Sequence, residues 1–254
     1  MKDIMRTESS NQSMLPIGFD RASFMDLLKR VENFGRRKMR IIKYSKSEEA
    51  LNIATHILGF ILSLIFFLPV VVKAYRSQDV IGFLAWLVYF IAIAVMFLSS
   101  SLYHAMTRPM ARTIFRAIDH GVIYLTIAGS YTPIILIGLR SAFSIVIFVL
   151  IWILALIGIA MNIIAFTTAK EDKIGKASMA IYMAMGWISL LLIYQIYRNI
   201  GLSYILFLVL GGLCYTLGAV FYSIRKIPYN HAIWHIFILV AAFVMFYGNY
   251  KFLG

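Results

Sequence analysis

Apolar residues occur in seven long runs along the chain, separated by short polar segments. Each run is close to the ~20 residues that an α-helix needs to cross the hydrocarbon of a bilayer. The short gaps favour antiparallel packing of consecutive helices. The pattern therefore predicts an all-α membrane protein, a seven-transmembrane helix bundle formed by residues 48–254. The predicted spans are 51–73, 80–103, 117–138, 142–166, 177–197, 202–224 and 230–250.

Two local features modify this pattern. Residues 1–47 precede the first span and are polar and basic, with apolar residues at helical spacing between Phe24 and Phe34. They predict an amphipathic helix near 23–34 on the membrane surface, with partner binding as the alternative. Inside the third span, Tyr131-Thr132-Pro133 indicates a kink or a helix end.

Composition supports a membrane protein and excludes several soluble classes. The chain is 61% hydrophobic and only 14% charged, and its mean hydropathy is +0.84. The net charge of +13 would suit a nucleic-acid partner. The basic residues instead lie beside the spans, where they favour contact with anionic inner-leaflet lipid, so no nucleic-acid partner is expected. Cys214 is the only cysteine, which excludes an intrachain disulfide and a cysteine-based metal site.

The distribution of basic residues between alternate gaps predicts the orientation. Of the 24 Lys and Arg residues, 19 lie in the N-terminal segment and the even-numbered gaps, and 5 lie on the other side. Basic loops stay in the cytoplasm. The N-terminus is therefore predicted to be cytoplasmic and, with seven spans, the C-terminus to lie outside. The first residues lack the apolar core of a cleavable signal peptide, so insertion is expected to depend on the first span.

This topology places all five histidines near the cytoplasmic ends of their helices. They are His56, His104, His120, His231 and His235. Histidines scattered through a core would not be expected to share one depth. Asp119 is placed at the same level and is the only acidic residue predicted to lie inside a span, since Glu48 and Glu49 are predicted to precede the first helix. A lone carboxylate in hydrocarbon costs several kcal/mol unless it meets a cation, a metal or hydrogen-bond donors.

Three of the histidines form the predicted metal site. His231 and His235 are four residues apart and share a helix face, and His104 comes from the second span. Three imidazoles with a water in the fourth position are a common open zinc site. We therefore predict one Zn²⁺ ligated by these three residues. Asp119 would orient or deprotonate the water, and Ser100, one turn before His104, would hydrogen-bond nearby.

The remaining polar residues leave alternatives open. Glu49, Asn52 and His56 form a polar stripe on the first span and are candidates for an outer layer around the site, as is His120. His56 and His120 could equally be interfacial histidines bonded to a backbone carbonyl or a headgroup, and Ser100 could serve helix packing. Imidazole also suits copper, nickel or iron. The spacing His-x-x-x-His is a weak signal by itself, and the absence of His-Glu-x-x-His excludes a zincin-type protease helix.

These residues stand in motifs that resemble a known family. The chain is similar to the hemolysin III branch of the progestin and adipoQ receptor (PAQR) family, seven-helix proteins related to alkaline ceramidases. The motifs are Glu48-Glu49-x-x-Asn52-x-x-Thr55-His56, Ser100-x-x-x-His104, Asp119-His120 with Ala128-Gly129-Ser130-Tyr131-Thr132-Pro133, Met185-Gly186-Trp187, Gly211-Gly212-x-x-Tyr215-Thr216-x-Gly218 and His231-x-x-x-His235.

The resemblance implies a zinc ion held by His104, His231 and His235, with Asp119 and Ser100 around its water. It also implies the bacterial branch and a bacterial inner membrane. Three functions follow as hypotheses. The first is a zinc-dependent hydrolase of lipid amide or ester bonds, which resembles a ceramidase. The second is a non-enzymatic membrane-homeostasis sensor or regulator in which zinc staples the helices. The third is a cytolytic pore or a transporter.

Overall fold

The computed structural model describes residues 22, 25, 44–168, 171–224 and 226–253, and within these residues it contains helices and no strand. The predicted amphipathic helix near 23–34 and most of the basic segment 1–47 lie outside the described residues. The helical elements are α2 (Lys46–Arg76), α3 (Val80–Ala105), α4 (Pro109–Pro133), η1 (Ile134–Leu139), α5 (Ala142–Thr168), α6 (Glu171–Trp187), η2 (Ile188–Leu192), α7 (Ile193–Asn199), α8 (Leu202–Ser223) and α9 (Asn230–Leu253).

The predicted seven-helix membrane bundle is confirmed. Seven helical stretches are long and apolar enough to cross a membrane. The third consists of α4 with η1, and the fifth consists of α6 from Ala177 onward with η2 and α7. Each predicted apolar run falls within or almost within one of these stretches, because residues facing lipid must be apolar along the whole crossing.

Two helices begin earlier than their apolar runs. The first span begins at Lys46, where the Ser45 hydroxyl oxygen accepts a hydrogen bond from the Glu48 backbone N–H at 3.1 Å. Glu49 therefore lies inside the first turn of α2, and the prediction that it precedes the helix was wrong. Likewise α4 begins at Pro109, well before residue 117. Caps and a proline in the first turn set these starts, whereas hydropathy reports only the part in contact with lipid.

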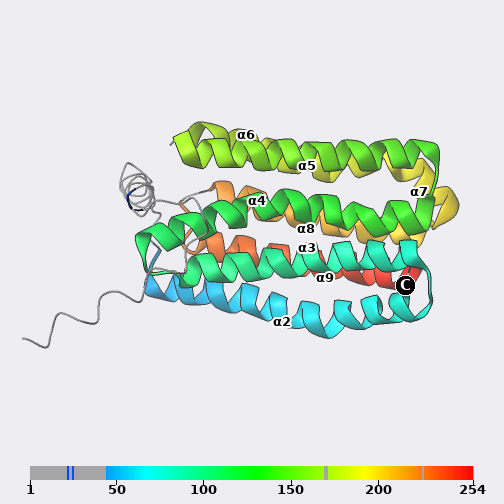
Figure 1. Ribbon diagram of the computed structural model, residues 1–254, viewed down its shortest axis with the longest axis horizontal. Coiled ribbons are helices and arrows are strands. Elements are labelled where there is room, and N and C mark those ends of the chain that lie inside the picture. Colours follow the sequence, from blue (N-terminus) through cyan, green and yellow to red (C-terminus); the bar gives the residue numbers. More distant parts are fainter. Residues whose placement is uncertain (1–21, 23–24, 26–43, 169–170, 225, 254) are drawn as a thin grey trace, which may run out of the picture. The chain divides into compact units, whose positions relative to one another are not determined.

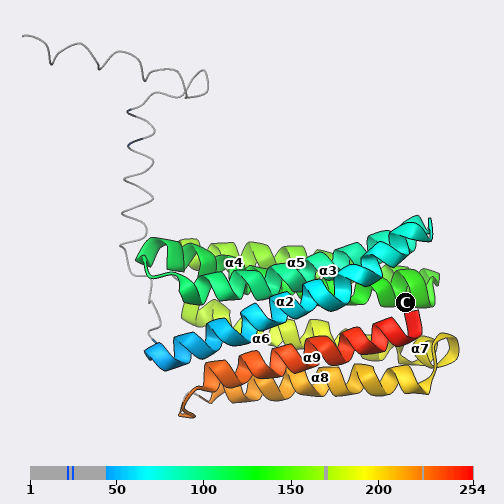
Figure 2. The ribbon, with the colours of Figure 1, turned by 90° about the horizontal axis from the view of Figure 1, so that it is seen from below.

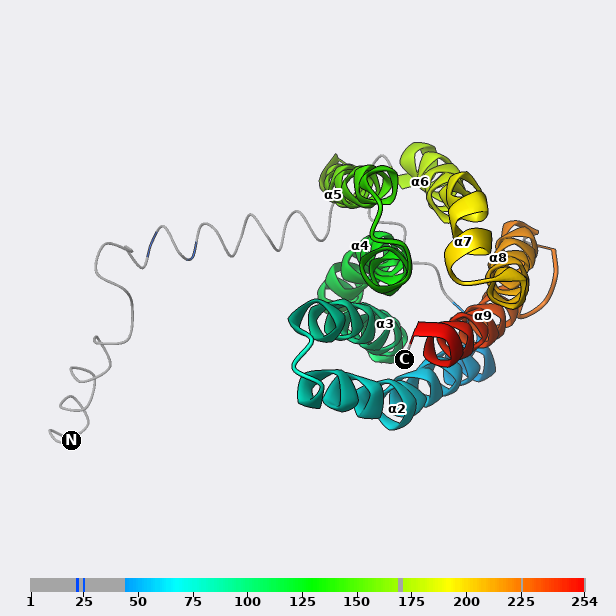
Figure 3. The ribbon, with the colours of Figure 1, turned by 90° about the vertical axis from the view of Figure 1, so that its right-hand side faces the viewer.

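The spans form a closed ring in chain order. Consecutive helices pack side by side, and α9 returns to pack against α2 as well as α8 (Figures 1 and 2). The end-on view shows α4 between α3 and α5 and set toward the inside of the bundle (Figure 3). Consistent with this position, 61% of the apolar stretch of the α4 span is buried, against 22–50% for the other spans. Residues on α4 are therefore well placed to contact several helices at once.

Close helix contacts depend on two glycines. A Cβ atom on Gly158 of α5 would overlap the ring of Tyr124 on α4. A Cβ on Gly211 of α8 would lie 2.5 Å from the Cγ of Met245 on α9. Small residues at these positions let the helices pack closely, which is the main source of helix association in lipid.

The fifth span is interrupted, and Tyr131 of α4 bridges the interruption. Its hydroxyl lies 2.8 Å from the carbonyl oxygens of Met185 and Gly186, to which it donates, and accepts from the Ser189 backbone N–H at 2.8 Å. These backbone groups lie where the α-helix changes to the short 3₁₀ segment η2. A non-helical backbone at membrane depth is tolerated only where the protein supplies such partners. The predicted irregularity around Tyr131-Thr132-Pro133 is a π-helical segment, η1, which begins directly after Pro133.

Replacing Tyr131 with Phe is expected to destabilise the bundle. The change leaves a buried backbone N–H and two carbonyl oxygens without their shared partner, which should lower the free energy of unfolding by about 1–2 kcal/mol. Thermal unfolding of the detergent-solubilised protein measures the effect. Tyr75→Phe is the matched control because Tyr75 is 68% exposed. Equal stability of the two variants would show that the Tyr131 hydroxyl does not stabilise the interruption.

Candidate metal centre

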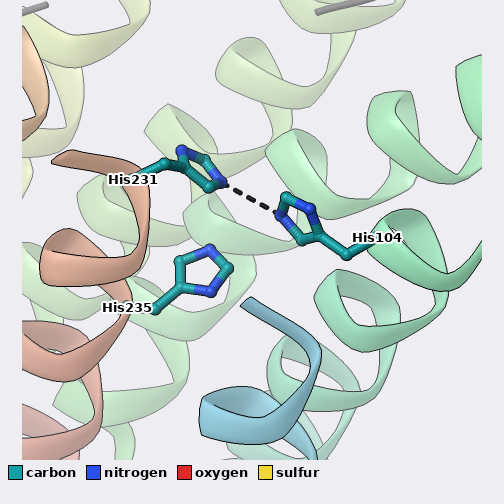
Figure 4. Close-up of side chains that lie close together, drawn as sticks. All are labelled: His104, His231 and His235. Carbon is teal, nitrogen blue, oxygen red and sulfur yellow. Dashed lines mark hydrogen bonds between the residues drawn. The ribbon is translucent and has the colours of Figure 1, made fainter. Parts of the chain in front are cut away.

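Three imidazoles converge at the end of the bundle where α3 finishes and α9 begins. His104 lies in the last turns of α3, while His231 and His235 lie in the first two turns of α9 (Figure 4). One nitrogen from each ring lies within 4.8 Å of the other two, and the Nε2 atoms of His104 and His231 are 3.0 Å apart. The three side chains are buried, with 3–7% of their surface exposed. The end of α3 and the start of α9, which are far apart in the sequence, thus supply the histidines of one cluster.

The outward-facing nitrogens of two rings support metal binding. The Nδ1 of His104 lies 2.7 Å from the Oε2 of Glu49, and the Nδ1 of His235 lies 3.3 Å from the carbonyl oxygen of Asn52. An acceptor at Nδ1 places the proton on that nitrogen and leaves Nε2 as a ligand. The Nδ1 of His231 has no hydrogen-bond partner among the described residues. Three neutral imidazoles with convergent nitrogens are a donor set that fits a transition-metal ion.

The polar stripe of α2 forms a wall beside the cluster. In addition to the contacts of Glu49, the Asn52 side-chain nitrogen lies 3.4 Å from Nδ1 of His104. The ring of His56 stacks on that of His235, with centroids 3.6 Å apart and planes 17° apart. Within the part of the chain that the structure describes, neither ring nitrogen of His56 has a hydrogen-bond partner, although the residue is only 2% exposed. The residues predicted as an outer layer on the first span therefore all contact the cluster.

Asp119 and Ser100 lie together but outside the group of three imidazoles. Asp119 is 8% exposed on α4, and Ser100 is 2% exposed on α3, one turn before His104. The Ser100 hydroxyl lies near the Asp119 carboxyl but makes no hydrogen bond within the described part of the chain. His120 does not join the cluster: its ring faces Phe166 of α5, with centroids 5.9 Å apart. Of the residues predicted around the water, only Ser100 shares a helix face with a ligand.

Two residues at the site were not predicted. Arg112, in the first turn of α4, forms an ion pair with the Oε1 of Glu49. Tyr44, just before α2, stacks on His231 with centroids 4.9 Å apart. Its burial raises the pKa of the Tyr44 hydroxyl above the usual value for tyrosine. The sequence assigned Arg112 to a loop, and the regular spacing of Arg108, Arg112 and Arg116 was the signal that a helix begins earlier.

An apolar cavity of about 140 Å³ lies between α4, the fifth span, α8 and α9. Trp234, which lines it, directly precedes His235. Tyr182 also lines it and donates a hydrogen bond from its hydroxyl to the His120 carbonyl oxygen at 2.8 Å. The polar groups of Ser130 and Thr216 at the wall are bonded to backbone carbonyls of their own helices. The cavity therefore presents a mainly apolar surface, and one of its lining residues is the sequence neighbour of a cluster histidine.

The fold and the site define a multi-pass membrane protein with a buried three-histidine cluster that could hold a metal ion. Comparison with known proteins identifies its family: the model of the haemolysin-III-related family matches residues 44–246. The chain belongs to this family. The resemblance found in the sequence motifs is confirmed.

Individual relatives match over most of their length. The chain is 34% identical to "Hemolysin-3" of Bacillus cereus over 210 residues, which is 83% of this chain and 94% of that protein. It is 33% identical to "Hemolysin-3 homolog" of Bacillus subtilis (strain 168) over 80% of this chain and 93% of that protein. A PAQR-type relative, the human "Monocyte to macrophage differentiation factor", is 31% identical over 66% of this chain and 70% of its own length.

Removing two ligands should abolish metal binding. Purified wild-type protein is expected to hold one ion per chain, whereas the His231→Ala/His235→Ala variant should hold almost none, since one imidazole cannot retain a divalent ion against a chelator. Elemental analysis after dialysis measures this directly. His120→Ala is the control because its ring faces Phe166, and it should keep its metal. Equal metal content in all three proteins would contradict a site at the cluster.

Proposed function

We propose that the protein is a zinc-dependent hydrolase that cleaves amide or ester bonds of lipids. The convergence of His104, His231 and His235 carries the proposal, because three imidazoles leave a coordination position for water. Two further observations support it. Ser100 lies one helix turn before His104, Asp119 is buried near Ser100 on the adjacent helix, and Trp234, which lines the apolar cavity, directly precedes His235. A ligand set, a carboxylate and an apolar chamber are the parts that such a reaction needs.

Each group has a distinct role in the proposed reaction. Zinc, when bound, lowers the pKa of its water and polarises the carbonyl of the scissile bond. Asp119 accepts the proton of the attacking water and returns it to the leaving amine or alcohol, so that water is added across the cleaved bond. Ser100 orients the Asp119 carboxyl from the neighbouring helix. The cavity holds an acyl chain, and its apolar wall excludes bulk water.

The orientation and location of the protein form part of the proposal. The histidine end is proposed to face the cytoplasm, because 19 of the 24 Lys and Arg residues lie on that side by the sequence count. The substrate would therefore come from the inner leaflet of a bacterial cell membrane. Membrane lipids are the proposed partners, with anionic lipid at the basic segment 1–47, and no nucleic acid is involved.

A non-enzymatic role is the second candidate. The cluster links α3 to α9, and its outer contacts extend to α2, so a bound ion would staple helices that are distant in sequence. Such a staple could serve a sensor or regulator of membrane homeostasis. A pore or transporter ranks third. A polar pair in the opposite half, Tyr204 with Asn249 at 2.6 Å, is buried among the helices, but the cavity wall is mainly apolar.

Asp119→Asn separates the first two candidates. The amide cannot accept the water proton, so hydrolysis is expected to fall by about 10²–10⁴-fold while metal content and folding persist. The measurement is the release of fatty acid from a panel of N-acyl sphingoid and acylglycerol lipids in mixed micelles, together with metal analysis. Loss of metal and folding in this variant would favour the structural staple. Zinc-loaded wild-type protein that cleaves no lipid in a broad lipidomic screen would contradict the hydrolase.

A larger side chain in the cavity should change the preferred chain length. Ala219 lines the cavity. Ala219→Phe would fill the space of about four methylene groups, and losing their burial removes about 3 kcal/mol, so the rate for long acyl chains should fall roughly 100-fold relative to short chains. Competition between lipids of different chain length measures the ratio. Leu217→Phe is the control, since Leu217 lies on the same helix and is 48% exposed. An unchanged ratio would show that the chain binds elsewhere.

A further inference from the structure

A carboxylate joins three helices at the metal centre. Glu49 of α2 uses one oxygen for each neighbour: Oε2 lies 2.7 Å from Nδ1 of His104 on α3, and Oε1 pairs with a guanidinium nitrogen of Arg112 on α4. The partners are 55 and 63 residues away in the sequence. The contacts form a continuous chain from Arg112 through Glu49 to a metal ligand.

This chain is more constrained than an ordinary surface ion pair. The side chains of His104, Glu49 and Arg112 are 0%, 19% and 12% exposed, so solvent screens their charges weakly. Arg112 is also held by its other contacts. Its guanidinium lies over the Tyr103 ring at 5.0 Å, and its Nη1 donates to the Met106 carbonyl oxygen at 3.3 Å. The carboxylate is therefore fixed from both sides.

The three histidines differ in the hydrogen-bond partner of their Nδ1 atoms. The Nδ1 of His104 contacts the charged carboxylate of Glu49, whereas the Nδ1 of His235 contacts the neutral carbonyl oxygen of Asn52. His231 has no hydrogen-bond partner at Nδ1 in the described ranges 44–168, 171–224 and 226–253. A carboxylate hydrogen-bonded to a ligating imidazole fixes its orientation and tautomer and makes its other nitrogen a stronger donor. Among the three ligands, His104 alone has this arrangement.

We propose that Glu49, held in place by Arg112, is the positioning residue that makes His104 the anchoring ligand of the metal centre. The ion pair directs the Nε2 of His104 toward His231, from which it is 3.0 Å away. Arg112 acts through Glu49 and not on the metal. The inference rests on the metal centre of the proposed function, and it does not depend on hydrolysis.

The structure offers a matched control for the test. Asp79 and Arg140 form another ion pair between elements, 3.8 Å apart, with side chains 48% and 56% exposed. Each pair can be neutralised by the same changes, Glu49→Gln and Arg112→Gln at the site, and Asp79→Asn and Arg140→Gln at the control. Full-length, metal-free protein in detergent is titrated with Zn²⁺ and with Co²⁺, and its thermal unfolding is measured without metal.

Glu49→Gln is expected to weaken metal binding by about 10–100-fold, the usual effect of removing such a partner. Arg112→Gln should weaken it less, and the double variant should bind no more weakly than Glu49→Gln, because Arg112 acts through Glu49. The visible spectrum of bound Co²⁺ should shift in the Glu49 variant, which reports a changed ligand field. Arg112→Lys should recover part of the affinity lost in Arg112→Gln. The control pair should show wild-type affinity.

Two results would overturn the proposal. One is wild-type affinity and an unchanged Co²⁺ spectrum in Glu49→Gln. The other is a loss of metal-free thermal stability in this variant with no change in affinity, which would make the ion pair a structural contact only. The outcome is independent of the hydrolase assay. A protein that binds metal through this chain but cleaves no lipid would contradict the enzyme and leave the positioning role intact.

Discussion

A polar group in a membrane-spanning bundle must find its partner within the protein, and this requirement organises the structure. Histidines at the ends of α3 and α9 meet one another, and the stripe of α2 supplies the groups behind them. The break in the fifth span follows the same rule through the Tyr131 hydroxyl. In lipid, a missing partner cannot be replaced by water. The positions of polar side chains therefore determine which helices pack together.

The same requirement distinguishes the histidine cluster from the rest of the buried polar groups. Most polar atoms at the wall of the cavity are satisfied by their own helices, as with Ser130 and Thr216. Among the described residues, several unpartnered atoms lie at or beside the cluster: both nitrogens of His56, the Nδ1 of His231 and the hydroxyl of Ser100. Others, on Tyr89, Tyr124, Trp152 and Asn249, lie elsewhere in the bundle. Unsatisfied buried groups are rare in folded proteins and call for an explanation. Those around the three convergent imidazoles are consistent with a site that binds something.

Much of the fold followed from the sequence because a lipid environment imposes a simple pattern. Seven apolar runs became seven spans, and the shared depth of the histidines brought His104, His231 and His235 together. The errors came from the polar ends of helices. Hydropathy does not report the first turns of α2 and α4, so Glu49 was placed before its helix and Arg112 in a loop. Their pairing required knowing that both turns exist and face each other. Likewise, spacing alone could not show that His120 turns toward α5.

The position of Glu49, His104 and Arg112 along the chain has a consequence for biogenesis. All three lie in the first three spans, whereas His231 and His235 belong to the last. Because spans enter the membrane in order during synthesis, the arginine, carboxylate and first imidazole can pair before α9 has been made. The charges of Arg112 and Glu49 then cancel each other from an early stage, before the remaining two histidines are present. The final span would complete the histidine cluster, so an ion held by all three imidazoles could be bound only after insertion of the whole bundle.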